Sequence, residues 1–295
     1  MENLDEICGL AQRHAGQPQP SLPRLNIHRF SEPTPLTLRV YKPMALIVLQ
    51  GTKKSIIGGQ VFDYGPGETM VVSAEITVMG QIVQASPEKP FLAVSLDLDP
   101  AVIMNVVRYL SETREFQMQP GFAFSLPNAE LIGAWQRLLA MYERMREIPV
   151  MALQLEHELI SRLMLSPHAE MLRQIAGADS RLSHIRRAMA WIREHYMDQL
   201  TVEDMAAVAG MSESVFHRRF RAVTALSPLQ YQKQIRLHEA RRRMFAKEAD
   251  AATIAFAVGY KSTSQFSREY KRLFGEPPHR DVATFTGLAC KESIG

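Results

Sequence analysis

Residues 201–228 read TVEDMAAVAGMSESVFHRRFRAVTALSP, and residues 250–278 read DAATIAFAVGYKSTSQFSREYKRLFGEPP. The two stretches form an internal repeat, with an offset of 49 residues before a turn and 50 residues after it. The shared residues are Ala206, Gly210, Ser212, Ser214, Phe216, Arg218 and Pro228 in the first copy, and Ala255, Gly259, Ser262, Ser264, Phe266, Arg268 and Pro278 in the second. A repeat of this kind indicates one supersecondary unit that is used twice.

Each copy has the pattern of a helix-turn-helix unit. In the first copy, Thr201 begins a capping-box pattern, which predicts the start of a helix. Gly210 permits the left-handed backbone of a tight turn, and Ser212 is expected to cap the next helix. The second copy repeats the turn and the cap with Gly259 and with Ser262 or Thr263. One such pattern also occurs in ordinary helical bundles, but two matched copies favour a pair of helix-turn-helix units.

The second helix of each unit is predicted to have an apolar face and a polar face. Phe216 and Phe220 point to the core in the first unit, as Phe266 and Tyr270 do in the second. The polar side chains left outside are Ser214, His217, Arg218 and Arg221 in the first unit and Thr263, Ser264, Ser267 and Arg268 in the second.

Arg218 and Arg268 occupy equivalent places in the repeat. An arginine can donate two hydrogen bonds to O6 and N7 of guanine, which is the commonest specific base contact. Both residues are therefore expected to read bases. The alternative is that they contact only phosphate, or pair with acids such as Glu213 or Glu269.

A long helix from about Pro228 to Lys247 is predicted to join the two units, and it carries Arg236, Arg241, Arg242 and Arg243. A rigid connector would fix the distance between the two recognition helices. Two helices that enter successive major grooves on one face of DNA must lie roughly 34 Å apart. Arg241, Arg242 and Arg243 lie on this connecting helix and could touch only phosphates, if they touch DNA at all.

The charge distribution supports a nucleic-acid partner. Residues 181–295 hold 19 Lys and Arg against 12 Asp and Glu, whereas the rest of the chain holds 15 against 19. This asymmetry between the two parts of the chain points to an anionic partner for the C-terminal part. The polar start of the chain and the absence of a long apolar run predict a cytoplasmic protein with neither a secretory signal nor a membrane span.

The segment from Leu36 to Leu98 reads as strands separated by glycine turns, which predicts a small barrel or sandwich. Gly58 and Gly59 lie between two of these runs and predict a tight hairpin. Helices are expected at about 100–110, 128–147 and 150–165. The apolar stripe of the second helix includes Leu131, Trp135, Leu138 and Tyr142, and is broad enough to face both the barrel and a partner chain in a homodimer.

The C-terminal stretches GMSESVFHRRFRAVTALSPLQYQKQIRLHEARR (210–242) and AFAVGYKSTSQFSREYKRLFGEPP (255–278) closely resemble the AraC/XylS family of transcription regulators. In that family the second helix of each unit reads bases. The resemblance therefore implies that Ser214, His217 and Arg218, and likewise Thr263, Ser264, Ser267 and Arg268, contact DNA. Ser212, Arg221 and Ser262 complete the expected DNA-binding set.

The N-terminal stretches YKPMALIVLQGTKKSIIGGQVFDYGPGETMVVS (41–73) and ASPEKPFLAVSLDLDP (85–100) resemble the regulatory domain of a subgroup of this family, which is cupin-like in fold. The resemblance implies effector sensing and dimerisation there. The expected fold is thus α+β and multidomain, with an N-terminal cupin-like β-barrel with flanking helices and an all-α domain with two helix-turn-helix units. The expected boundaries are an arm at 1–21, the sensing domain at 22–165, a linker at 166–180, the DNA-binding domain at 181–286 and a tail at 287–295.

The strand residues are mostly aliphatic, which favours an uncharged, partly apolar effector; the residues expected to bind it are Gln50, Met70, Met79 and Gln81. A one-residue register error would invert every face, so the inward positions stay open. The expected partners are promoter DNA, the effector, a second copy of the chain and, for an activator, RNA polymerase.

Three other classes of protein compete with this interpretation. A metal-dependent barrel enzyme is disfavoured because residues 36–98 contain no histidine, and neither a catalytic triad nor a cofactor is expected. A constitutive architectural DNA binder would need no large non-basic N-terminal domain. A redox-responsive regulator acting through Cys8 or Cys290 is the remaining alternative, although neither cysteine has a basic cluster nearby in sequence.

Overall fold

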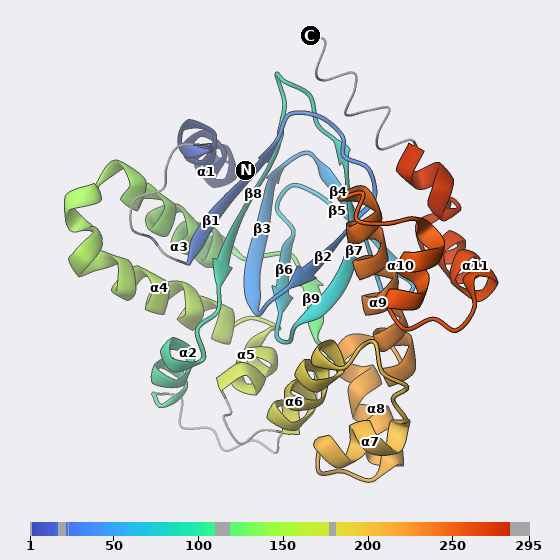
Figure 1. Ribbon diagram of the computed structural model, residues 1–295. Coiled ribbons are helices and arrows are strands. Elements are labelled where there is room, and N and C mark those ends of the chain that lie inside the picture. The colour runs from blue at the N-terminus through green and yellow to red at the C-terminus, as the bar shows by residue number, and fades with distance from the viewer. Residues whose placement is uncertain (1, 17–21, 23, 110–118, 177–180, 284–295) are drawn as a thin grey trace. The chain divides into compact units, whose positions relative to one another are not determined.

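A computed structural model describes residues 2–16, 22, 24–109, 119–176 and 181–283 of the chain. Contacts divide the chain into an N-terminal unit, which runs to Ser183 and includes residues 222–225, and a C-terminal unit, which comprises residues 184–221 and those from 226 onward. The N-terminal unit combines β-sheets with helices, and the C-terminal unit is helical (Figure 1). This confirms the expected α+β multidomain fold.

The strands of the N-terminal unit form two antiparallel sheets. One has five strands in the order β1-β8-β3-β6-β9, and the other has four in the order β2-β7-β4-β5. The strands are β1 (Leu25–Phe30), β2 (Thr37–Tyr41), β3 (Met44–Gln50), β4 (Thr52–Ile57), β5 (Gln60–Tyr64), β6 (Thr69–Val72), β7 (Ile76–Gln84), β8 (Phe91–Asp97) and β9 (Phe122–Ser125). Among the described residues the two sheets stay separate, so the expected barrel is an open, cupin-like pair of sheets.

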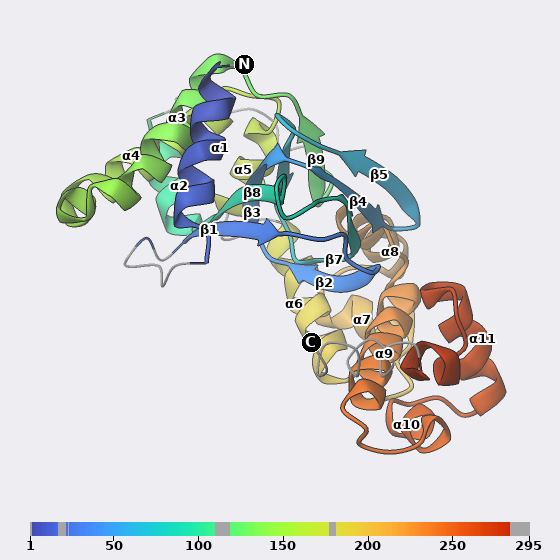
Figure 2. The same ribbon diagram turned by 90° about the horizontal axis from the view of Figure 1, so that it is seen from above.

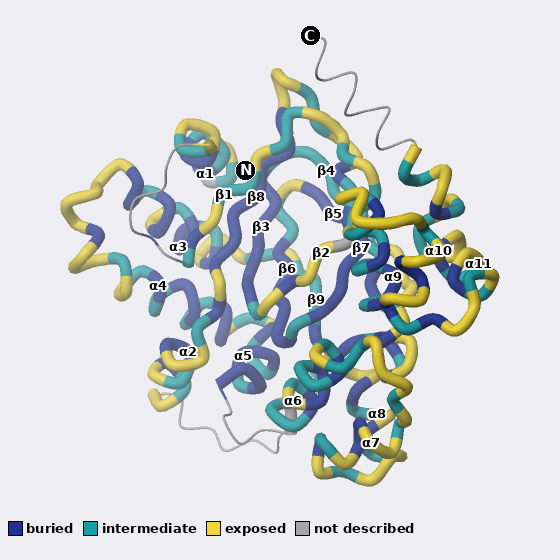
Figure 3. Tube along the Cα trace, viewed as in Figure 1, coloured by how far each residue is buried: buried dark blue, intermediate teal, exposed yellow. Residues whose placement is uncertain are grey.

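The inner strands of the five-stranded sheet, β8, β3 and β6, are buried on both faces, which explains why β3 reads as an unbroken apolar run (Figure 3). Alternate side chains of a strand point to opposite faces. Met44, Leu46 and Val48 belong to the core between the two sheets, whereas Ala45 and Ile47 belong to the core under the helices.

The hairpin predicted at Gly58 and Gly59 is confirmed. Both glycines have positive φ, at 59° and 85°, and Ile57 pairs with Gln60 across the turn. Positive φ at both central residues is the requirement of the type I′ turn, whose twist matches that of the flanking strands. The sequence therefore determines the β4–β5 connection locally.

The helices of the N-terminal unit are α1 (Glu2–His14), α2 (Pro100–Val107), α3 (Ala129–Leu139), α4 (Ile148–Met164) and α5 (Ala169–Ala176). Helix α1 was expected to be part of a polar arm; instead it packs beside α3 and against β3 and β8 (Figure 2). Its apolar residues Leu4, Ile7, Leu10 and Ala11 recur at helical spacing, which is the signal that could have identified it.

Two further stretches differ from the expected elements. The helix expected at 128–147 ends at Leu139, and the chain continues in 3-10 turns at Ala140–Glu143 and Met145–Glu147. Residues expected in a linker form α5, whose Leu172 and Ile175 belong to the core under the sheet. These apolar side chains tie the chain to the N-terminal unit as far as residue 176.

The C-terminal unit consists of α6 (Arg181–Glu194), α7 (Val202–Val208), α8 (Glu213–Thr224), α9 (Pro228–Phe245), α10 (Ala251–Ala257) and α11 (Thr263–Phe274). The capping box at Thr201 is present, and Ser262, not Thr263, caps α11 by accepting a hydrogen bond from the amide of Gln265. The expected connecting helix is α9. The described residues thus contain both predicted helix-turn-helix units, α7–α8 and α10–α11.

The two turns are built alike. Gly210 has φ 62° and Gly259 has φ 93°, and each donates its amide to the carbonyl three residues earlier. The residue after each glycine donates to the alanine five residues earlier, Met211 to Ala206 and Tyr260 to Ala255, at 3.0 Å in both units. These bonds satisfy the carbonyls at a helix end, as in a Schellman motif.

Gly259→Ala is expected to destabilise the protein more than Gly210→Ala. Both substitutions carry the cost of left-handed backbone, about 1–2 kcal/mol. A Cβ at Gly259 would also lie 2.4 Å from the carbonyl oxygen of Met197, whereas at Gly210 the nearest atom is 3.8 Å away. Urea denaturation of the two variants measures the difference, and equal losses of unfolding free energy would refute this account of the second turn.

His238 of α9 gives the C-terminal unit a predicted pH dependence. The centre of its ring lies 4.9 Å from that of Phe274, and the two rings are nearly perpendicular. Its Nε2 has no hydrogen-bond partner among the described residues. Burial, and then the charge of Arg241, lowers the pKa of His238 to about 3. The unfolded chain binds the proton below pH 6.5 while the folded chain does not, so stability is lost as the pH falls.

At pH 5 the neutral state of His238 in the folded chain lowers the free energy of unfolding by about 2 kcal/mol. His238→Leu is expected to remove this part of the decline between pH 7 and pH 5, measured by denaturant unfolding at each pH. An unchanged slope would show that the histidine keeps its ordinary pKa.

Candidate DNA-binding surface and effector cavity

Helix α8 presents a continuous polar face. Phe216 and Phe220 are fully buried, which fixes the orientation of the helix on its own unit. The opposite face consists of exposed side chains at positions i, i+1, i+4, i+5 and i+8: Glu213, Ser214, His217, Arg218 and Arg221. Ser212, which precedes the helix, is exposed as well. The structure thus brings the expected DNA contacts of the first unit onto one surface.

Helix α11 repeats this arrangement. Phe266 and Tyr270 are buried, and the opposite face carries Thr263, Ser264, Ser267 and Arg268. All are exposed except Thr263, which is half-buried, and the cap residue Ser262 is exposed. The matching burial in α8 and α11 follows from the sequence repeat.

Arg218 and Arg268 are available to a ligand. Neither forms an ion pair with another described residue. Glu269, an alternative partner for Arg268, is instead 2.8 Å from Lys233 and accepts a hydrogen bond from Tyr260. Both guanidinium groups can therefore reach a base or a phosphate.

Lys271 was not among the expected DNA contacts. It lies on α11 at the position that corresponds to Arg221 on α8, and it is exposed. The offset of 50 residues after the turn could have identified it. Each recognition helix therefore ends its polar face with a cation.

The arginines of α9 form interactions within the chain. Arg236 is buried, and its guanidinium donates to carbonyl oxygens of Tyr196, Met197 and Asp198 and to that of Gly259. Arg241 forms two hydrogen bonds with Asp281 and lies over the ring of Phe274. These two arginines therefore hold the unit together.

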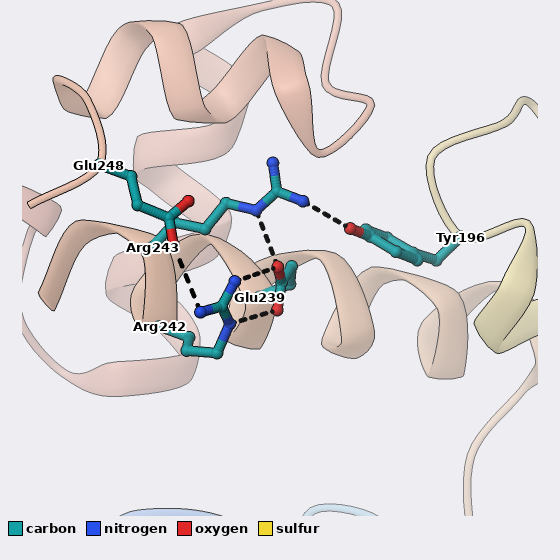
Figure 4. A network of polar contacts seen from close by, with 5 residues as sticks. All are labelled: Tyr196, Glu239, Arg242, Arg243 and Glu248. Atoms are coloured by element: carbon teal, nitrogen blue, oxygen red, sulfur yellow. Dashed lines mark hydrogen bonds and ion pairs between the residues drawn. The ribbon is translucent and has the colours of Figure 1, made fainter. Parts of the chain in front are cut away.

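Arg242 and Arg243 converge on one carboxylate (Figure 4). Glu239 accepts two hydrogen bonds from Arg242 at 2.9 Å and one from Arg243 at 2.8 Å, and these bonds lower its pKa. Arg243 also donates to the hydroxyl of Tyr196. Both guanidinium groups are already engaged within the chain, which leaves the polar faces of α8 and α11 as the candidate DNA-binding surface.

A cavity of about 440 Å³ lies between the two sheets of the N-terminal unit. Side chains from β1, β2, β3, β4, β7 and β8 line it. Its apolar wall includes Phe30, Met44, Leu46 and Phe91, and its polar wall includes His28, Tyr41, Lys53 and Ser95. This size lies within the range of small-molecule sites.

Of the four residues expected to bind an effector, Gln81 lines this cavity. Met70 is fully buried in the core between the sheets, and Met79 lies on the face of β7 opposite to Val78, which belongs to that core. Gln50 lies next to a bulge in β3; its amide nitrogen donates to the carbonyl of Pro90, and its side-chain oxygen lies 3.9 Å from the sulfur of Cys8. The bulge shifts the alternation of the strand.

The residues expected at a dimer interface are core residues of their own unit. Leu131, Trp135, Leu138 and Tyr142 are at most 2% exposed and belong to the cluster under the five-stranded sheet. This corrects the interpretation of the stripe, because these side chains leave no surface for a partner. The apolar side chains exposed nearby are Val150 and Leu153 of α4, at 67% and 49%.

The cysteines give little support to redox sensing. Burial, and then the charge of Asp5, raises the pKa of the Cys8 thiol, which disfavours the reactive thiolate. Cys290 lies outside the described residues.

Among the helices of the described part of the chain, none is long and apolar enough to cross a membrane.

Two matched helix-turn-helix units and a separate two-sheet domain define a DNA-binding transcription regulator. Residues 21–171 match the model of the AraC-type transcriptional regulator N-terminus, and residues 205–282 match that of a helix-turn-helix domain. The chain therefore belongs to the AraC family of transcriptional regulators.

A relative agrees with this assignment, and two solved structures share the fold. The transcriptional activator RhaS of Klebsiella pneumoniae (strain 342) is 28% identical over 120 residues, which are 41% of this chain and 42% of RhaS. The match thus spans less than half of that relative. Two structures of ToxT from Vibrio cholerae share the fold: one with a bound unsaturated fatty acid (TM-score 0.50, 9% identity, 88% of this chain and 94% of that one) and one at 1.65 Å resolution (TM-score 0.51, 12% identity, 88% and 97%).

Proposed function

We propose that this protein binds promoter DNA sequence-specifically through α8 and α11 and that a small-molecule effector in the N-terminal cavity controls its activity. The observation that carries the first part is the matched pair of polar faces, each with an arginine at the same position that forms no ion pair with a described residue. Ser212, Ser214, His217, Arg218 and Arg221 would contact one half-site, and Ser262, Thr263, Ser264, Ser267 and Arg268 the other. Lys271 would join them as a phosphate contact.

The cavity supports the effector part of the proposal. It lies in the unit that matches the AraC-type N-terminus, and it combines an apolar wall with a few polar groups, as ligand sites commonly do. A ToxT structure with this fold carries a bound small molecule. No enzymatic role is proposed, and the site of action would be the cytoplasm, where promoter DNA is accessible.

Recovery of the DNA that is bound to the protein in cells tests this function. The tagged full-length chain is expected to enrich a small set of promoter fragments that share a motif, and expression of the adjacent genes should change when the chain is deleted. If RNA polymerase is a partner, the change is a loss of expression, as for the activator RhaS. Recovery of DNA without a shared motif would contradict sequence-specific regulation.

We propose a homodimer in which the exposed apolar residues of α4 take part. Leu153→Asp is expected to leave the fold intact and to shift the protein to monomers, because it places a charge on an exposed apolar patch. Leu138→Asp is the matched contrast; it buries an unpaired charge and should unfold the N-terminal unit. Light scattering measures the oligomeric state of both variants, and circular dichroism measures whether they are folded. An unchanged dimer from Leu153→Asp would place the interface elsewhere.

A further inference from the structure

The cavity of the N-terminal unit carries an excess of positive charge. Its lining includes Arg39 of β2, Lys42 just after β2 and Lys53 of β4, against one acid, Asp97 of β8. The sequence had favoured an uncharged ligand because the strands are mostly aliphatic, but the fold brings these three cations to the lining of one cavity. The charges bear directly on which molecule the cavity can hold.

Lys53 faces the cavity without a carboxylate partner among the described residues. Its Nζ donates to the hydroxyl of Tyr41 and lies 5.2 Å from the centre of the Tyr41 ring. The next residue, Lys54, instead lies 3.8 Å from the carboxylate of Asp63. A half-buried ammonium that is paired only with a neutral phenol would gain from an anionic ligand.

Arg39 adds a second cation to the same wall. Its guanidinium lies 5.7 Å from the centre of the Phe30 ring, and it forms no ion pair with a described residue. A guanidinium stacked on an aromatic face keeps its N–H groups free at the edge for a carboxylate or similar anion. Lys53 and Arg39 thus both line the cavity from strands of the four-stranded sheet.

The pKa of His28 is affected by the resulting positive potential. Its Nε2 lies 2.8 Å from the hydroxyl oxygen of Ser95, and burial, together with the charges of Lys53 and Arg39, lowers its pKa to about 4. The ring is therefore neutral near pH 7 and serves as a hydrogen-bonding group. The local field disfavours a further cation and favours an anion.

The remaining wall is apolar and in part aromatic. Phe30 and Phe91 lie 6.3 Å apart, and Met44, Leu46 and Ala93 continue the surface. We propose that the cavity binds an organic anion with an apolar body, whose charged group pairs with Lys53 and Arg39 while its body contacts this wall. The proposal rests on the proposed function, because it names the class of effector for that cavity.

Two fluorescent probes that differ in one charged group test the proposal on the full-length chain. 1-Anilinonaphthalene-8-sulfonate carries a sulfonate, and N-phenyl-1-naphthylamine is its neutral counterpart. The sulfonate is expected to bind at one site per chain, at least about ten-fold more tightly than the neutral probe, since a charge-assisted pair contributes about 1.5–3 kcal/mol. Lys53→Met should remove this preference and leave binding of the neutral probe within about two-fold.

Lys54→Met is the matched control, because it removes the neighbouring lysine, whose ammonium is paired with Asp63. It is expected to leave both affinities unchanged. Arg39→Gln is the second test variant and should weaken the sulfonate alone. Binding of the neutral probe confirms that each variant is folded.

The outcomes separate this proposal from the proposed function. Equal affinities for both probes, insensitive to Lys53→Met and Arg39→Gln, would overturn the assignment of an anion while leaving a ligand-binding cavity. Failure of both probes to bind would overturn the anion proposal and also remove the cavity from the proposed function. Equal weakening of the sulfonate by Lys54→Met would show that general surface charge, and not the cavity, attracts it.

Discussion

Replacing Arg236 with methionine is expected to destabilise the C-terminal unit by about 3–5 kcal/mol. Arg236 is 8% exposed, and its guanidinium donates to three carbonyls after α6 and to the carbonyl of Gly259 in the second turn. Methionine keeps the apolar stem but leaves these carbonyls without a donor. Since the bonds join α9 to the segment before α7 and to the turn of the second helix-turn-helix unit, their loss should also weaken binding to DNA that carries both half-sites.

Arg242→Met is the control on the same helix. Arg242 is an exposed side chain whose ion pairs are with Glu239 and Glu248, and exposed pairs of this kind contribute little to stability. Denaturant unfolding of the full-length variants measures the difference. If Arg236→Met and Arg242→Met lower the free energy of unfolding equally, the hydrogen bonds of Arg236 do not stabilise the C-terminal unit.

Arg218→Ala is expected to relax base preference at one position of the first half-site. A bidentate contact to guanine contributes roughly 1–3 kcal/mol of discrimination, so preference at that base should fall by about 5-fold to 150-fold. Arg268→Ala should act in the same way on the second half-site. The measurement is a set of affinities for operators that are mutated one base at a time.

Arg221→Ala and Lys271→Ala are the contrasting variants. If these cations touch phosphate, their loss weakens binding to all sequences alike and reduces the slope of log affinity against log salt by about 0.9. An Arg218→Ala protein with reduced affinity and unchanged base preference would show that Arg218 also contacts phosphate only.

The C-terminal unit was predictable because its signals are local. Capping residues, turn glycines and buried aromatics determine the structure within about one turn of helix. Because the sequence repeats, each of these patterns occurs twice. The sequence did not reveal which arginines of α9 are exposed. Arg236 and Arg242 are both charged residues on one helix, and only tertiary packing buries the first and exposes the second.

The N-terminal unit was predictable in class but not in its cavity. Glycine turns and apolar runs predicted the strands, but a bulge near Gln50 redirects that side chain, and strand pairing between distant segments brings Arg39 and Lys53 to one wall. The stripe that includes Leu138 illustrates the same limit. Helical spacing identified a buried face, but spacing alone does not distinguish contact with the same chain from contact with a second copy.

Selection of bound DNA from a random pool by the full-length chain tests the central claim most directly. The account predicts two short conserved blocks whose centres lie about 10 base pairs apart, one for α8 and one for α11, since the two helices enter successive major grooves. Loss of conservation in the first block with Arg218→Ala, and in the second with Arg268→Ala, would assign each block to its helix. Selected DNA with no conserved block, bound equally well by the wild-type chain and both variants, would contradict it.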